Sequence, residues 1–348
     1  AFRATVNELE GSVAIAASAA DAADSLLLAL RGSGQALYIG LAEDAFVVAS
    51  EPYGVVEETT TYLRLDGDVP VDPSNPASIG QIVRLVGTRA GDSAGIERWA
   101  YDGTRITVDD ADLVEAEITT RDIDRGDAPH FLLKEIGEAP ASFRKTLRGK
   151  LIEIDGRPDV RLGDEVLAPH VRAALADGSI RRILAIGQGT AAVAARALVE
   201  GLAAFAPHLP ITVECILATE LSGFHLAESM ADTLVVAVSQ SGTTTDTNRT
   251  VDLVRARGAH VIGIVNRRNS DLTDRADGVL FTSDGRDVEM SVASTKAFYA
   301  QIAASFLLAA ALADAMGIDA PERAEVLDGL RRIPEAMEQT FALRDDIA

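Results

Sequence analysis

The part of the chain best suited to chemistry is a run rich in hydroxyl groups that follows the apolar segment Thr233–Val238. It reads Ser239-Gln240-Ser241-Gly242-Thr243-Thr244-Thr245-Asp246-Thr247 and leads into a helical pattern. Glycine allows a sharp bend. A helix start offers an anion free amides and the positive end of a dipole. The run therefore suits a phosphate dianion. It has no lysine, which argues against a triphosphate-hydrolysing P-loop. An ordinary helix cap is the alternative, but a cap needs only one such residue.

A second candidate loop reads Gly187-Gln188-Gly189-Thr190-Ala191-Ala192 and follows the apolar segment 182–186. Its glycines let a ligand approach the backbone, and Thr190 begins a helical pattern whose amides can face an anion. A tight strand-to-helix turn would look the same. The string also fits the dinucleotide fingerprint G-x-G-x-x-A. That fingerprint leaves a nicotinamide-cofactor oxidoreductase as an alternative, although Glu214 lies inside the next strand and not at its end.

A third candidate loop, Glu289-Met290-Ser291-Val292-Ala293-Ser294-Thr295-Lys296, precedes a long apolar helical pattern. Ser294 or Thr295 is expected to cap that helix and leave amides facing the strand ends. Lys296 could pair with an anion or remain solvated. Capping alone would also explain the sequence of this loop.

Other reactive residue types give no clear site. The five histidines share no ligand spacing, so no metal site is expected; they are His130, His170, His208, His225 and His260. Glu220 and Glu228 are expected to be surface carboxylates, as is common in an acidic chain. The single cysteine, Cys215, lies in an apolar run and forms no internal disulfide, which fits a reducing, cytoplasmic location. No catalytic acid, base or nucleophile is assigned, and no cofactor is expected.

Five apolar segments alternate with helical patterns in the third part of the chain, which predicts a parallel sheet covered on both faces. The expected strands are Arg182–Ile186, Ile211–Ile216, Thr233–Val238, His260–Val265 and Gly278–Thr282, and the expected helices are Thr190–Ala204, Thr244–Arg257 and Thr295–Met316. The order favours an α/β, flavodoxin-like, doubly wound layer. Ligands bind such sheets at the carboxyl ends of the strands, which is where the three candidate loops lie.

The first part of the chain is expected to be rich in β-strands. Short Val-, Ile- and Tyr-rich runs occur at 12–17, 36–40, 45–49 and 61–65, and a hairpin is expected at 96–108. Asp21–Leu30 is the only clear helix candidate before residue 80. We divide the chain into a β-rich region at 1–128, a connector at 129–170 with a helix at Phe131–Arg148, an α/β domain at 171–320 and a charged linker at 321–348.

Composition narrows the function further. The 348 residues carry 53 acidic and 32 basic side chains, a net charge of -21. This charge would repel a nucleic-acid backbone, so no nucleic-acid partner is expected. The most apolar stretch, Ile302–Ala313, is too short to cross a membrane and is expected to be a buried helix.

Three motifs in order resemble the sugar isomerase (SIS) domain. They are Gly189-Thr190, Ser239-Gln240-Ser241-Gly242-Thr243-Thr244 and Val292-Ala293-Ser294-Thr295-Lys296. The match is closest to the first of two such domains in the isomerising glutamine–fructose-6-phosphate aminotransferase family. The connector His130–Ile136 resembles that family's interdomain segment. Arg3–Ala17, Leu37–Ser50 and Leu63–Val69 resemble the later half of its Ntn-type glutaminase domain.

The resemblance implies an enzyme of hexosamine biosynthesis that forms glucosamine 6-phosphate from fructose 6-phosphate and glutamine, usually as a dimer. It implies contacts with the sugar phosphate from Thr190, Ser239, Gln240, Ser241, Thr244, Val292 and Ser294. A phosphosugar-sensing SIS protein without catalytic activity is the alternative.

The chain departs from the family pattern in ways that affect catalysis. Ala191 replaces the family's usual serine, and Thr243 stands where an acidic residue is common. No N-terminal cysteine nucleophile is present, and the family's second SIS domain, with its Schiff-base lysine, would follow Ala348. We therefore expect this chain to be an internal part of a longer polypeptide, with glutamine bound by upstream residues.

Overall fold

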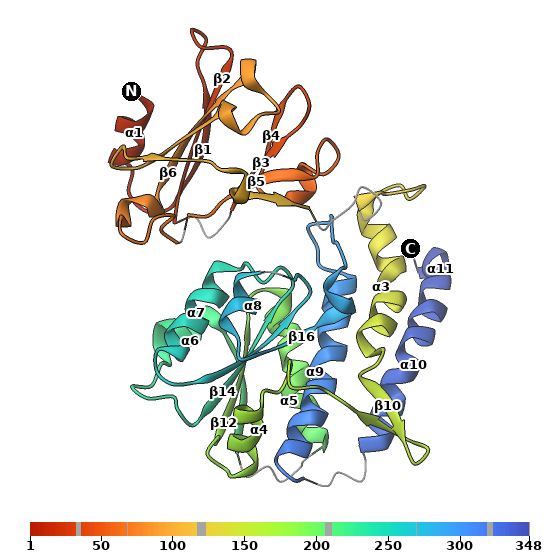
Figure 1. Ribbon diagram of the computed structural model, residues 1–348. Helices are drawn as coiled ribbons and strands as arrows, with labels where there is room; N and C mark the ends of the chain where they lie inside the picture. The colour runs from red at the N-terminus through yellow and green to blue at the C-terminus, as the bar shows by residue number, and fades with distance from the viewer. Residues whose placement is uncertain are drawn as a thin grey trace. The chain divides into compact units, whose positions relative to one another are not determined.

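A computed structural model describes residues 1–32, 36–67, 69–116, 123–205, 211–268, 270–318 and 323–347 (Figure 1). The chain divides into two compact units, Ala1–Asp124 and Arg125–Ala348.

The described part of the first unit includes the short helix α1 (Phe2–Glu8) and two antiparallel sheets. The larger sheet has the order β1-β2-β6-β7-β8, formed by Val13–Ser18, Ser25–Arg31, Gln81–Val86, Ile96–Ala100 and Arg105–Ile106. The smaller has the order β4-β3-β5-β9, formed by Phe46–Ala49, Leu37–Leu41, Thr61–Leu65 and Leu113–Glu115. The expected hairpin is confirmed, since β7 pairs antiparallel with β8.

Side chains from both sheets form the larger apolar cluster in the described part of this unit. It contains Leu28, Leu30, Ile39, Leu63, Leu65, Val83, Leu85 and Ile96. Alternate residues of β2, β5 and β6 contribute to it, as expected for strands that bury one face. Full burial of each such side chain stabilises the fold by roughly 1.5–3 kcal/mol.

The helix expected at Asp21–Leu30 is wrong. Residues before Ser25 form turns, and β2 (Ser25–Arg31) is a central strand that pairs with both β1 and β6. Periodicity alone cannot distinguish a short apolar run in a strand from one in a buried helix. The backbone partners on either side decide in favour of the strand.

The second unit contains the expected doubly wound layer. Its five strands are all parallel, in the order β13-β12-β14-β15-β16. The strands are β12 (Arg182–Gly187), β13 (Thr212–Leu217), β14 (Thr233–Ser239), β15 (His260–Val265) and β16 (Gly278–Phe281). This is the flavodoxin-like order, whose switch point lies between the first and third strands. Here these are β12 and β14.

Helices cover both faces of this sheet. Alternate side chains of the strands point to one face of the sheet and pack there against α4 (Pro169–Ala176), α5 (Thr190–Phe205) and α9 (Lys296–Ala315). On the other side they pack against α6 (Ala218–Phe224), α7 (Thr245–Arg255) and α8 (Asp271–Arg275). The three helices expected from the sequence correspond to α5, α7 and α9.

Helix α9 is long and apolar enough to cross a membrane by length and composition alone, but 72% of its 18-residue apolar window is buried within the fold. The expected buried helix is confirmed.

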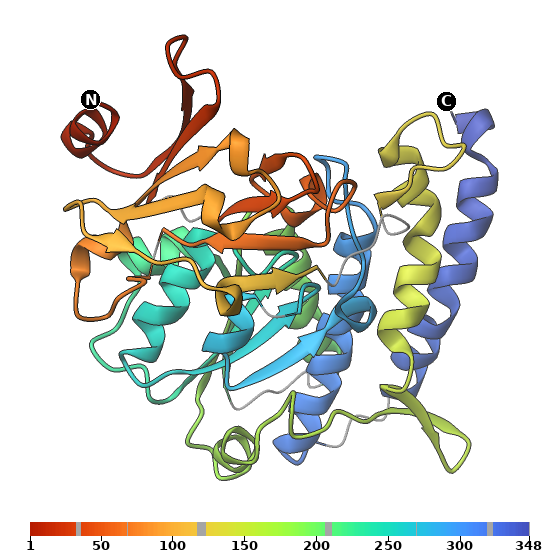
Figure 2. The same ribbon diagram turned by 45° about the horizontal axis from the view of Figure 1, so that its top comes forward.

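Helix α3 (Phe131–Leu147) packs against α9 and against α10 (Arg323–Ala342), beside which it runs in Figures 1 and 2. Arg144 of α3 and Glu338 of α10 form an ion pair of 2.5 Å between Nη1 and Oε1. A hairpin, β10 (Leu151–Ile154) with β11 (Arg157–Val160), follows α3, and α11 (Arg344–Ile347) follows α10. Short 3-10 turns lie at 52–54, 76–79, 87–89, 93–95, 110–112 and 282–285.

Candidate functional site

A cavity of about 230 Å³ opens at the carboxyl ends of β12 and β14, beside the switch point. All seven residues singled out from the sequence line it: Thr190, Ser239, Gln240, Ser241, Thr244, Val292 and Ser294. The volume is below the roughly 300–1,000 Å³ of drug-sized sites, as suits a small metabolite. The three candidate loops therefore share one cavity, while the ligand contacts of these residues remain a prediction.

The loop between β14 and α7 is held by its own hydrogen bonds. Ser239 Oγ accepts from the Gly242 amide at 3.0 Å and lies 3.3 Å from Thr244 Oγ1. Ser241 Oγ accepts from the amide and the hydroxyl of Thr243, at 3.2 and 2.9 Å. These bonds fix the hydroxyls of Ser239, Ser241 and Thr244 around the cavity before any ligand binds.

Gly242 is the pivot of this loop. Its φ is +68°, a conformation that favours glycine. Its carbonyl accepts from the Asn248 side chain and the Leu272 amide, both at 3.0 Å. A Cβ here would meet the Ser270 hydroxyl and would lie 2.7 Å from Ser270 Cβ. The loop is thus clamped between α7 and α8.

Two helices point their amino ends at the cavity, because α5 begins at Thr190 and α7 begins directly after Thr244. The Thr244 side chain makes no capping bond to α7. The first-turn amides of a helix have no partner within the helix. None of the described residues lining the cavity is Lys or Arg. Any favourable field for an anion must come from hydroxyls, amides and helix dipoles.

The third helix end, that of α9, is capped differently from the sequence expectation. Glu289 accepts from the Thr295 amide at 2.7 Å, the Ala297 amide at 3.0 Å and the Ser294 hydroxyl at 3.1 Å. The expected cap by Ser294 or Thr295 is wrong, since the Thr295 side chain makes no capping bond. A carboxylate can satisfy several amides at once and is favoured by the helix dipole.

Two carboxylates of α3 bind the loop that precedes α9 and the first residue of α9. Glu135, only 1% exposed, accepts from the Met290 amide and from the amide and hydroxyl of Ser291. Glu138 pairs with Lys296, 2.5 Å from its Nζ, and with Lys134 at 3.1 Å. Burial raises the pKa of Glu138, but the hydrogen bonds and charges of Lys296 and Lys134 outweigh burial and leave that pKa below its ordinary value. Lys296 is therefore paired within the protein.

Six lining residues were not singled out as ligands from the sequence, and three of them, Gln188, Gln301 and Glu289, bring an amide or a carboxylate to the cavity. Gln188 donates to Thr219 Oγ1 at 3.4 Å and to Asp246 Oδ2 at 3.3 Å, while its Oε1 is buried without a partner among the described residues. Gln301 of α9 lines the cavity and is 1% exposed. Glu289 is the third. In the sequence, the only signal for Gln301 as a lining residue is the helical spacing that turns its side chain toward the strand ends.

Residues set aside in the sequence lie away from the cavity lining. Glu220 and Glu228 are exposed, as expected for surface carboxylates. Glu214 sits inside β13, opposite Leu184, and does not reach the strand end. Burial raises the pKa of Cys215, against a smaller opposing effect of Arg196, so this thiol is not set up as a nucleophile.

Comparison of the chain with known proteins also points to an SIS domain at this part of the fold. Residues 179–311 match the family model for the SIS domain. A glutamine–fructose-6-phosphate aminotransferase (isomerising) of Corynebacterium glutamicum is 33% identical over the whole of this chain and half of its own length. The same enzyme of Symbiobacterium thermophilum is 40% identical over 63% of this chain and 34% of its own length. The chain spans about half the length of the curated relatives it matches.

Among solved structures, the C-terminal domain of glucosamine-fructose-6-phosphate aminotransferase from Francisella tularensis superposes with a TM-score of 0.56. The two share 23% identity, over 64% of this chain and 59% of that one. This likeness supports the fold.

Proposed function

Because this chain carries an SIS domain and is similar along its whole length to half of the isomerising glutamine–fructose-6-phosphate aminotransferases, we propose that its cavity binds a hexose phosphate. Fructose 6-phosphate or glucosamine 6-phosphate is the expected ligand. The observation that carries this proposal is the preorganised loop between β14 and α7, whose hydroxyls and helix amides border a cavity with no Lys or Arg among its described lining residues.

The phosphate group is assigned to Ser239, Ser241 and Thr244. Hydroxyls can donate to a dianion, and the amino ends of α5 and α7 add the positive ends of their dipoles. Hydrogen bonds to a charged group contribute about 1.5–3 kcal/mol each. Neutral donors fix the geometry of the group without a flexible cation.

The sugar hydroxyls are assigned to the amide groups on the other walls. Gln301 brings a buried amide that makes no hydrogen bond within the described part of the chain, and Gln188 brings a buried, unpaired Oε1. A buried polar group without a partner costs stability, so both are positioned to bind a polar ligand. Thr190, Gln240, Val292 and Ser294 complete the proposed contacts.

For the complete polypeptide, we propose the formation of glucosamine 6-phosphate from fructose 6-phosphate and glutamine, in the cytoplasm and as a homodimer. In this scheme residues 1–128 form the later part of a glutaminase-like domain, 129–170 the connector, 171–320 the phosphosugar-binding domain and 321–348 a linker. Glutamine would be bound by residues upstream of this chain. Turnover of both substrates by the complete polypeptide separates this activity from phosphosugar sensing alone.

The direct test is calorimetric titration of the chain with fructose 6-phosphate and, separately, with fructose. We expect binding of the phosphate ester and none of plain fructose at the same concentrations. The double variant Ser239→Ala/Ser241→Ala removes two bonds to the charged group and should weaken binding about 100-fold or more.

Ser179→Ala is the matched control, because Ser179 is exposed and lies outside the cavity lining. This variant should bind fructose 6-phosphate as the parent does. Circular dichroism confirms that each variant is folded. Equal affinity for fructose and its phosphate would refute the phosphate assignment, as would unchanged binding by the folded double variant.

A further inference from the structure

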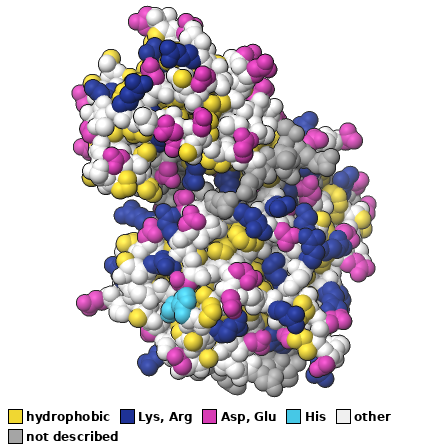
Figure 3. Space-filling model, in the orientation of Figure 1, with side chains coloured by type: hydrophobic (Ala, Val, Ile, Leu, Met, Phe, Trp, Pro, Cys, Tyr) yellow, Lys and Arg dark blue, Asp and Glu magenta, His cyan; other side chains and the backbone are white. Residues whose placement is uncertain are grey.

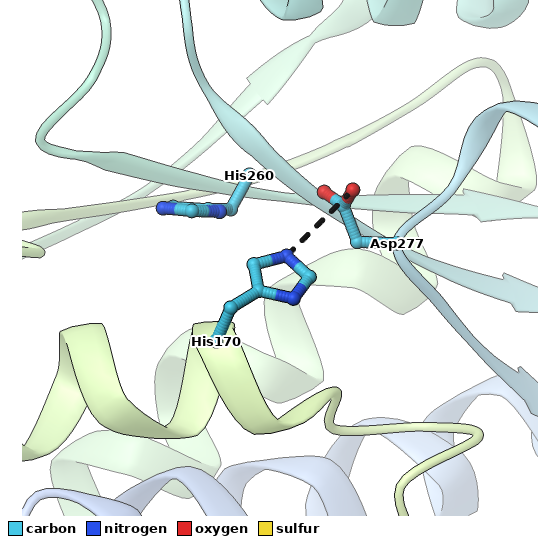
Figure 4. A group of neighbouring side chains, drawn as sticks. All are labelled: His170, His260 and Asp277. Carbon is cyan, nitrogen blue, oxygen red and sulfur yellow. Dashed lines mark ion pairs between the residues drawn. The ribbon is translucent and has the colours of Figure 1, made fainter.

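We propose that His170, His260 and Asp277 form a binding site for a divalent transition-metal ion that prefers nitrogen and oxygen ligands, such as zinc. The three side chains come from different elements: α4, the first residue of β15, and the segment before β16 (Figure 4). They lie at the amino-terminal edge of the parallel sheet, whereas the phosphosugar cavity lies at the carboxyl ends of its strands.

The ligand atoms already converge. One atom from each side chain lies within 4.8 Å of the others. His170 Nε2 is 3.9 Å from Asp277 Oδ1, and the rings of His170 and His260 are 5.4 Å apart between centroids. Zinc bonds nitrogen and oxygen at about 2.0–2.2 Å, which places tetrahedral ligand atoms about 3.3 Å apart. Binding would require the histidine rings to rotate toward Asp277 to close that difference.

Asp277 is held in place, and the exposed His170 can adjust. Asp277 Oδ2 accepts from the Val261 amide at 2.7 Å, and the Asp277 amide donates to the Val261 carbonyl at 2.8 Å. The hydrogen bond from the Val261 amide therefore orients the carboxylate beside His260. Metal-bound carboxylates are usually oriented by such a hydrogen bond to a neighbouring group. The side chain of His170 is 55% exposed and is free to close on an ion. Two histidines and one carboxylate leave a position for water.

Charge sets the strength of the site. Arg255 opposes metal binding, since its Nη1 lies 3.0 Å from Asp277 Oδ1. The Arg255 side chain is 39% exposed and can move into solvent. An ion has access to the site because the His170 side chain is 55% exposed. Figure 3 shows histidine, in cyan, at the surface of the face it draws.

The bound ion would join three segments that are far apart in the chain. It would tie α4 to the start of β15 and to the segment before β16, and so raise the thermal stability of the second unit. This inference does not depend on the proposed phosphosugar function, because the two sites lie at opposite edges of the sheet.

The test is calorimetric titration of the full chain with zinc chloride after treatment with a chelator. We expect one ion per chain and an increase in Tm. His170→Ala should weaken binding at least 10-fold while leaving the fold intact, because His170 is largely exposed. His260→Ala should do the same. The control His225→Ala removes an exposed histidine on another loop and should leave binding unchanged.

Arg255→Gln should change zinc affinity in the opposite direction to the histidine variants. Removal of the competing cation should tighten zinc binding about 10-fold. With copper as the probe, electron paramagnetic resonance should show coupling to two imidazole nitrogens in the parent and to one in His170→Ala. The proposal is overturned if zinc fails to bind with one-to-one stoichiometry, or if folded His170→Ala and His260→Ala variants bind as the parent does.

Discussion

Replacement of Gly242 by alanine, compared with the same replacement at Gly189, measures how tightly the phosphate loop is clamped. Both glycines have positive φ, +68° and +55° respectively, and both lie in loops that border the cavity. A Cβ at Gly189 meets no atom within 4 Å. At Gly242 it meets the Ser270 hydroxyl, Ser270 Cβ at 2.7 Å and Val265 Cγ1 at 3.0 Å. The pair separates backbone strain from steric overlap.

The expected magnitudes follow from these contacts. A non-glycine residue in the left-handed region costs about 1–2 kcal/mol, partly offset by about 0.4–1 kcal/mol from a stiffer unfolded chain. Gly189→Ala should therefore lose about 1 kcal/mol. Gly242→Ala adds an overpacking cost of about 1–3 kcal/mol, because Ser270 begins α8 in a capping box and cannot move freely. Its total loss should be about 2–4 kcal/mol.

The assay is urea unfolding followed by far-ultraviolet circular dichroism, with fructose 6-phosphate titration of each folded variant. Gly242→Ala should have the lower midpoint of the two variants. It should also lose phosphosugar affinity, because the hydroxyls of Ser239 and Ser241 are placed by this turn. If both variants lose the same free energy of unfolding, or if Gly242→Ala binds the phosphosugar as the parent does, the reasoning about this loop is wrong.

Two further predictions concern the loop before α9. Glu289→Ala removes the cap of α9 and should cost about 1–2 kcal/mol of folding free energy. Calorimetry should show this loss as a fall in Tm of roughly 2–8 °C. The control Glu220→Ala, at an exposed site, should leave Tm nearly unchanged, and an equal fall in both variants would contradict the capping role. The pKa of Glu138 is below its usual 4.5 in the folded chain, so its pairing with Lys296 stabilises the fold above that value and is lost as pH falls through the folded pKa. Urea midpoints from pH 7 down to the acid range should therefore fall more steeply for the parent than for Glu138→Gln, and parallel curves would show that the pair contributes nothing.

The sequence alone determined the sheet and the three loops that border the cavity. Alternation of apolar strands with helical patterns gives a parallel layer, and parallel strands bring their carboxyl ends to one edge. Residues at or just beyond the carboxyl end of a strand, such as Ser239 and Thr190, are therefore placed together by local pattern. The same logic could not place Gln301, because its position depends on how α9 packs.

Tertiary structure decided whatever depends on partners far apart in the chain. Glu289 displaced Thr295 as the cap of α9 because the folded loop brings a carboxylate to that helix end. β2 is a strand because β1 and β6 supply backbone partners on both sides. His170 and His260 share no ligand spacing in the sequence, yet they lie side by side because α4 packs at the amino-terminal edge of the sheet. Periodicity records which face of an element is apolar, but only packing determines which side chains meet.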